Sequence, residues 1–204
     1  MSFPPREFIN LPDTRLAVYQ AGPANGMPIL LVHGWPELAY SWNPLIGSLL
    51  KTGYRVITYD LRGFGHSDAP RGDSHYQISN HVADIENLLD ALGINQAVLC
   101  GHDWGGIITW HAARMLAPRI SHVISLCTPH VRRAPVDPTS IFEKRYGPEH
   151  YFVKFRDHPE TADLFAKNPD AFFRLMFRTT PAGARPSPDM HHIPKHFQAY
   201  LDAG

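Results

Sequence analysis

The chain has 204 residues, enough for one substantial hydrophobic core of the α/β type rather than for two independent domains. Its 19 basic and 19 acidic residues cancel, so no net charge points to nucleic acid or to an anionic membrane as a partner. Apolar residues make up 44% of the chain, and no apolar run approaches the ~20 residues that span a bilayer. The composition therefore predicts an ordinary globular protein.

The N-terminus and the cysteines bear on the cellular compartment. Residues 1–5 lack both the basic segment and the apolar core of a signal peptide. Cys100 and Cys127 each lie near the end of an apolar run, and we expect both to be buried free thiols. A cytoplasmic location fits these features.

Short apolar runs in the first 126 residues predict the strands of a sheet. Residues 6–11 and 15–21 flank a turn and predict an antiparallel pair. Four continuous apolar runs follow, as expected for strands that are covered on both faces of a parallel sheet. These runs are residues 28–32, 54–59, 96–100 and 122–126.

Helical patterns lie between the later runs. Apolar residues recur at helical spacing over 82–92, with Ser79 a candidate N-cap and Gly93 a suitable residue after the C-terminus. A second such pattern covers 107–116 and ends before Pro118. Strands that alternate with helices imply right-handed crossovers and a mostly parallel sheet, so we predict an α/β fold.

The character of the sequence changes after about residue 126, where strand-like runs cease and prolines become frequent. Short apolar patches at 151–155, 162–165 and 171–177 look like brief helices joined by loops. We therefore predict a core over residues 1–129 and an inserted helical lid over 130–204.

The segment from Cys100 to Gly106 has the form of a nucleophile elbow between a strand and a helix. Small residues are needed two positions before and two after the reactive residue, and Gly101 and Gly105 meet this need around Asp103. An aspartate there is already ionised at neutral pH and needs no general base to attack a carbon atom. The structural alternative is that Asp103 only caps the following helix.

Three motifs carry a resemblance to a known family. They are Gly101-His102-Asp103-Trp104-Gly105-Gly106, His33-Gly34-Trp35-Pro36-Glu37, and the loop from Asp60 to Pro70. Taken in chain order, they resemble the epoxide hydrolase branch of the α/β-hydrolases, over residues from about 28 to 127. The resemblance implies the α/β-hydrolase fold and an aspartate nucleophile.

The resemblance also implies roles for two tryptophans and a tyrosine. It assigns the oxyanion-hole N–H donors to Trp35 and Trp104, and a proton-donating lid tyrosine to Tyr151. The same three residues are expected to contact the substrate. Residues 151–156 resemble the family's lid segment Tyr-x-x-x-Phe-Gln, with Arg156 in place of the usual glutamine. Tyr146 and Tyr200 are the rival tyrosines.

Other polar residues are expected to have structural roles. His33 is interpreted as a hydrogen-bonding residue rather than a base. Asp60 and Arg62 are expected to pair and so to brace the loop that contains Gly63 and Gly65, whose spacing does not match a phosphate-binding loop. No metal site or cofactor is expected, since the histidines at 191, 192 and 196 have no acid or cysteine at ligand spacing.

The family places a triad acid, a catalytic histidine and a second lid tyrosine after the lid, and no residue of this sequence is assigned to these roles. We therefore expect the fold to be incomplete at the C-terminus and the 204-residue chain alone to be inactive. The predicted activity of the complete enzyme is hydrolysis of a small apolar epoxide by water, and a homodimer is compatible with the sequence. The alternatives are a haloalkane or haloacid dehalogenase, a non-catalytic ligand-binding relative, and an inert fragment.

Overall fold

The computed structural model describes residues 2–131, 136–148, 150–158, 160 and 167. Within this part of the chain, residues up to His130 belong to one compact unit, and those from Val131 onward belong to a second.

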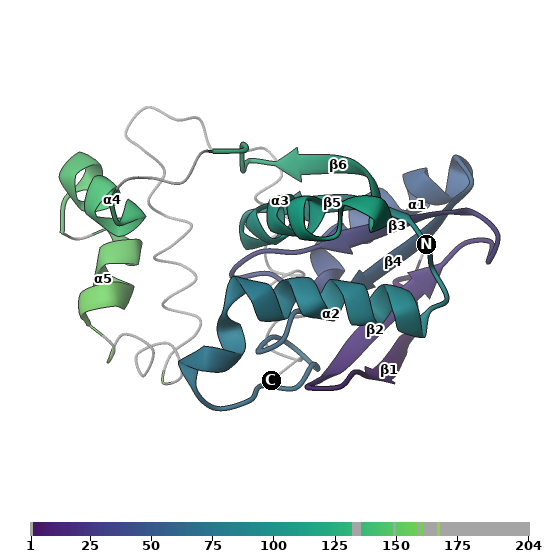
Figure 1. The fold of residues 1–204 in the computed structure, drawn as a ribbon, viewed down its shortest axis with the longest axis horizontal. Coiled ribbons are helices and arrows are strands. Elements are labelled where there is room, and N and C mark those ends of the chain that lie inside the picture. Colours follow the sequence, from purple (N-terminus) through teal and green to yellow (C-terminus); the bar gives the residue numbers. More distant parts are fainter. Residues whose placement is uncertain (1, 132–135, 149, 159, 161–166, 168–204) are drawn as a thin grey trace. The chain divides into compact units, whose positions relative to one another are not determined.

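Six strands of the first unit form one sheet in the order β1-β2-β4-β3-β5-β6 (Figure 1). The first two strands run antiparallel to their neighbours, and the other four run parallel to one another. The strands are β1 (Arg6–Asn10), β2 (Arg15–Ala21), β3 (Met27–Val32), β4 (Tyr54–Tyr59), β5 (Ala97–His102) and β6 (Ile120–Leu126). The expected antiparallel start and mostly parallel sheet are confirmed.

Helices cover both faces of this sheet. Helices α2 (Ile78–Ala91) and α3 (Trp104–Met115) pack on one face and bury side chains such as Leu30, Ile57 and Leu99. Helix α1 (Asn43–Lys51), which the apolar pattern did not predict, packs on the other face. Short 3-10 turns lie at Ala39–Trp42, Asp73–Tyr76 and Ala117–Arg119. The α/β-hydrolase architecture is thus present in the first unit.

Two expectations about the helices and strands of this unit are wrong. Ser79 is not the N-cap of α2, because the helix begins one residue earlier and the carbonyl of Gln77 already accepts the Asn80 N–H at 2.9 Å. Strand β6 is not covered on both faces, since its side chains alternate between half-buried and exposed. The alternation arises because successive side chains of a strand point to opposite faces of the sheet, and α3 packs against β6 on one of these faces.

The two cysteines differ in their surroundings. Cys100 is buried in β5, and burial raises the pKa of its thiol to about 11. Cys127 is exposed and has a positive φ of 61° directly after β6, so the expectation that it is buried is wrong. The apolar run before it ends at the surface, because the chain turns away from the sheet at this residue.

The expected pairing of Asp60 with Arg62 is also wrong. Arg62 forms a bidentate, almost fully buried ion pair with Asp84 of α2, in which Nε of Arg62 lies 2.7 Å from Oδ2 of Asp84. Asp60 is buried as well, and its carboxylate accepts the Ala39 N–H at 3.0 Å and the Tyr19 hydroxyl at 3.1 Å. The two neighbouring charges face different partners because the chain turns at Arg62, after β4 has ended at Tyr59.

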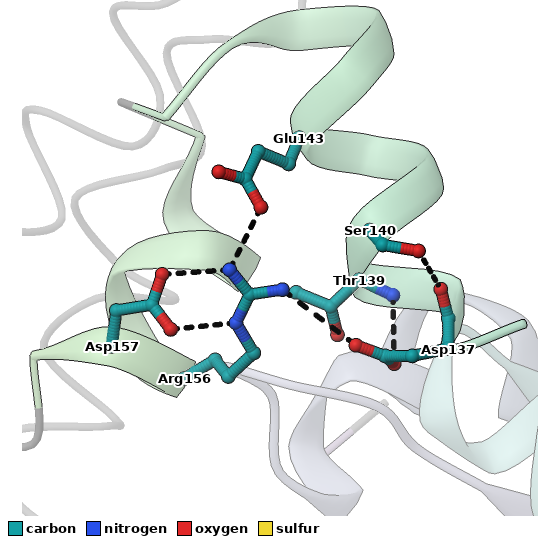
Figure 2. Close-up of polar contacts among 6 residues, drawn as sticks. All are labelled: Asp137, Thr139, Ser140, Glu143, Arg156 and Asp157. Carbon is teal, nitrogen blue, oxygen red and sulfur yellow. Dashed lines mark hydrogen bonds and ion pairs between the residues drawn. The ribbon is translucent and has the colours of Figure 1, made fainter.

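The second unit contains α4 (Pro138–Tyr146) and α5 (Tyr151–Asp157). Arg156 connects them: its guanidinium binds Asp157 on α5, Glu143 on α4 at 2.8 Å, and Asp137 before α4 at 3.6 Å (Figure 2). The patch predicted at 151–155 lies in α5, and those at 162–165 and 171–177 lie outside the described residues. No helix in the described ranges is both long and apolar enough to cross a membrane.

Candidate active site

Asp103 lies in the turn between the end of β5 and the start of α3. Its backbone has φ 53° and ψ −120°, a conformation that costs a non-glycine residue free energy and persists only where the surroundings enforce it. Its side chain makes no capping hydrogen bond to α3. Instead, Oδ1 accepts the backbone N–H of Trp35 at 3.0 Å. The geometry therefore favours the nucleophile interpretation over that of a helix cap.

Glycines allow this turn to approach the β3 loop closely. A Cβ atom on Gly105 would collide with the carbonyl oxygens of Val32 and His33, and one on Gly34 would lie 2.5 Å from Cβ of Asp103. Backbone carbonyls cannot yield as the end of a flexible side chain can, and Cβ of Asp103 is bonded directly to its backbone, so both positions require glycine. The need for a small residue at Gly105, predicted from the elbow pattern, is thereby explained.

Trp35 and Trp104 are both neighbours of Asp103, the first through a hydrogen bond and the second in the sequence. Trp35 belongs to the loop after β3 and donates its N–H to Asp103, as described above. Trp104 is the first residue of α3, so its N–H is one of the four at the helix start that have no partner within the helix. Its side chain is 45% exposed. These positions suit the predicted oxyanion hole, and the role of both residues stays a prediction.

His33 has both of its ring nitrogens engaged in the core. Its Nε2 accepts the Leu61 N–H at 2.9 Å, so Nδ1 carries the proton and donates to the Gly34 carbonyl at 2.8 Å. Complete burial lowers the pKa of this imidazole and keeps it neutral. A neutral ring with both nitrogens occupied connects the β3 loop to the β4 loop, which agrees with the structural role expected for His33.

Glu37 and His102 form a pair beside the elbow. This pair was not predicted from the sequence. The Glu37 carboxylate Oε2 lies 3.0 Å from Nδ1 of His102 and accepts the Gly34 N–H at 3.1 Å. Burial alone would raise the pKa of Glu37, but the hydrogen bonds from His102 and Gly34 hold it below its ordinary value. The same hydrogen bond with Glu37 raises the pKa of His102. The pair thus fixes the loop that carries Trp35 to the residue before Asp103.

Tyr146 and Tyr151 both lie in the second unit. Tyr151 is the first residue of α5, and its ring contacts His150 and Phe152 with centroids 4.8 and 4.4 Å apart. Tyr146 ends α4 and is 54% exposed. Tyr200 and the histidines at 191, 192 and 196 lie outside the described residues. The role assigned to Tyr151 stays a prediction.

Comparison with known proteins identifies the family. A family model described as alpha/beta hydrolase fold matches residues 27–182. The chain belongs to the α/β-hydrolase fold family. Epoxide hydrolase A of Mycobacterium tuberculosis is 37% identical over 163 residues, which are 80% of this chain and 51% of that protein. Epoxide hydrolase 4 of Mus musculus is 34% identical over 182 residues, which are 86% of this chain and 49% of that protein.

Solved structures of this α/β-hydrolase fold are similar over nearly the whole chain. The crystal structure of epoxide hydrolase A from Mycobacterium thermoresistibile has a TM-score of 0.85 and 29% identity, and the match covers 98% of this chain and 71% of that one. An epoxide hydrolase from Vigna radiata matches with a TM-score of 0.82 and 28% identity, over 98% of this chain and 68% of that one. The chain spans about half the length of the curated relatives named above.

Gly34→Ala in the full-length protein is expected to lower any turnover that depends on Asp103 about 100-fold, because a misplacement of about 1 Å at a reacting group has effects of this size. The new Cβ would lie 2.5 Å from Cβ and 2.7 Å from Oδ1 of Asp103 and would push that carboxylate away from the Trp35 N–H. Steady-state kinetics measures the loss. Gly47→Ala is the control, since nothing lies within 4 Å of its new Cβ in α1. Unchanged turnover of the Gly34 variant would mean that the β3 loop yields.

His102 is expected to titrate above the usual histidine pKa of about 6.5 in the native protein. The attraction to Glu37 is fully present below the pKa of the unfolded state and is lost as the pH rises through the raised native value. Glu37→Gln removes the charge and should move the pKa of His102 back toward 6.5, as followed by NMR titration. Glu86→Gln on the exposed side of α2 should leave it unchanged. Equal titration in all three proteins would rule out the ion pair.

Proposed function

We propose that the full-length protein hydrolyses epoxides to vicinal diols through an alkyl-enzyme ester on Asp103. The observation that carries this proposal is the position of Asp103 at a strained elbow, with one carboxylate oxygen held by the Trp35 N–H at 3.0 Å. A carboxylate held in this way presents its second oxygen to a carbon atom. The relatives named as epoxide hydrolases support the choice of an epoxide as the electrophile.

In the first step, the free carboxylate oxygen of Asp103 attacks an epoxide carbon, and the bond from that carbon to the ring oxygen breaks. The oxygen leaves as an alkoxide that remains attached to the substrate through the other carbon. Tyr151 donates its phenolic proton to this alkoxide. The products are an ester on Asp103 that carries a hydroxyl group and a tyrosinate that must be reprotonated.

In the second step, water adds to the Cγ atom of the ester, and negative charge develops on the former carbonyl oxygen. The N–H groups of Trp35 and Trp104 stabilise this oxyanion. Collapse of the intermediate breaks the bond between Cγ and the substrate oxygen, which takes one proton of the water and leaves as the diol. The other proton of the water goes to the Tyr151 tyrosinate, so the Asp103 carboxylate and the Tyr151 phenol are both regenerated. No histidine of the 204 residues is assigned as the base that activates this water.

The proposed reactants are a small apolar epoxide and water, with no cofactor and no nucleic acid. The cytoplasmic location remains a prediction, and a homodimer is compatible with the sequence. Dehalogenation is the second candidate, because an aspartate nucleophile followed by tryptophan also suits displacement of a halide from carbon. In that reaction the Trp104 N–H would bind the departing halide.

A single-turnover reaction in ¹⁸O-labelled water tests both the nucleophile and the substrate class. With styrene oxide, the two-step scheme puts the label into the Asp103 carboxylate and leaves the first diol unlabelled, as followed by peptide mass spectrometry. Label in the first diol would mean direct attack by water and would overturn the scheme. Release of chloride from 1-chlorobutane, with no diol from styrene oxide, would favour the dehalogenase instead.

A further inference from the structure

The backbone carbonyl of Asp103 accepts a hydrogen bond from outside its own helix. Two of its donors are the N–H groups of Gly106 at 3.0 Å and Ile107 at 3.2 Å, which belong to the first turn of α3. A third donor is the Thr128 hydroxyl at 3.0 Å, from the segment after β6 and 25 positions along the chain. Thr128 therefore connects the end of a neighbouring strand to the elbow.

Thr128 is itself held in place on several sides. Its carbonyl accepts hydrogen bonds from the Ser125 hydroxyl at 2.5 Å and from the indole N–H of Trp110 at 3.0 Å. Its side chain lies so close to α3 that a Cβ atom on Gly106 would be 2.7 Å from Cβ of Thr128. The hydroxyl thus reaches the Asp103 carbonyl from a position fixed by both β6 and α3.

The hydrogen bond acts on a peptide group that also carries a proposed oxyanion donor. The carbonyl of Asp103 and the N–H of Trp104 belong to the same planar, trans peptide unit, so they point in opposite directions and turn together. Fixing the carbonyl therefore fixes the direction of the N–H. We propose that Thr128 is a positioning residue that aims the Trp104 N–H at the oxyanion, an inference that rests on the proposed function.

The proposal predicts which half-reaction depends on Thr128. Hydrolysis of the ester builds negative charge on the oxygen that the Trp104 N–H must face, so a misdirected donor slows this step. Alkylation moves charge away from the Asp103 carboxylate and toward the epoxide oxygen, where the Trp104 N–H has no role. Loss of the hydroxyl should therefore change the ratio of the two rate constants, whereas a general loss of structure would lower both.

The test uses Thr128→Val, which keeps the shape of the side chain without its hydroxyl, and Thr128→Ser, which keeps the hydroxyl. The full-length protein is mixed with styrene oxide, quenched at short times, and analysed by intact mass for the adduct on Asp103. In Thr128→Val we expect the hydrolysis rate constant to fall about tenfold, less than the loss of a whole oxyanion donor, with the alkylation rate constant within about twofold of the wild type. In Thr128→Ser both constants should stay close to the wild-type values.

The outcomes separate this inference from the proposed function. Equal effects of Thr128→Val on both rate constants, or none on either, would overturn the positioning role while leaving the nucleophile in place. A wild-type protein that never forms an adduct on Asp103 would overturn the proposed function, and this inference with it. If Thr128→Val does not fold, Thr128→Ala removes the hydroxyl with less steric demand and must give the same change in ratio.

Discussion

Asp103→Asn in the full-length protein is expected to lower epoxide turnover by a factor of about 10⁴ or more, as removal of a catalytic nucleophile does in other enzymes. Asparagine nearly matches the size of aspartate and tolerates a positive φ better than alanine does, so the turn at φ 53° should be retained. It lacks the anionic oxygen that would attack the epoxide. Product formation measured against styrene oxide, with the unfolding midpoint measured in parallel, checks both expectations.

Asp103→Ala is the companion variant, and it removes the side chain that accepts the Trp35 N–H. It should be equally inactive and less stable than Asp103→Asn, because alanine is strained at this φ and loses the hydrogen bond. Substantial diol production by either variant would identify a different nucleophile. Inactivity caused by unfolding would appear as a changed circular dichroism spectrum.

Asp84→Asn is expected to lower the free energy of unfolding by about 3–5 kcal/mol, the usual cost of removing one partner from a buried ion pair. The side chains of Arg62 and Asp84 are each only 2% exposed, so the guanidinium would be left in the core without a counter-charge. Urea denaturation followed by tryptophan fluorescence measures the change. Neither Arg62 nor Asp84 belongs to the elbow at Asp103. Asp84→Asn should therefore lower the free energy of unfolding without changing the rate of the chemical step.

Asp90→Asn is the matched control, because Asp90 lies on the same helix and pairs with Arg119, but its side chain is 59% exposed. Water screens such a pair, so the change should be below about 1 kcal/mol. Similar losses for Asp84→Asn and Asp90→Asn would show that burial of the Arg62 pair adds no measurable stability. A difference of several kcal/mol would assign that stability to the buried pair.

Local patterns were sufficient to predict the sheet and the elbow. Continuous apolar runs marked β3, β4 and β5, because strands covered on both faces bury every residue. The glycines around Asp103 predicted the sharp turn, because a crowded backbone excludes Cβ atoms whatever the rest of the fold contains. These features depend on neighbours in the sequence, and a single chain displays them directly.

Contacts between distant segments were decided by the tertiary structure. Arg62 pairs with Asp84 rather than with nearby Asp60, Glu37 meets His102 across 65 positions, and Thr128 reaches Asp103 across 25. Each contact depends on which strands become neighbours in the order β4-β3-β5-β6 and on which side of the sheet a loop leaves. No periodicity or motif records that order, because long-range pairing follows from burial of the whole core. The sequence by itself therefore determined the fold class and the candidate nucleophile, and only the tertiary structure decided which side chains hold that nucleophile in place.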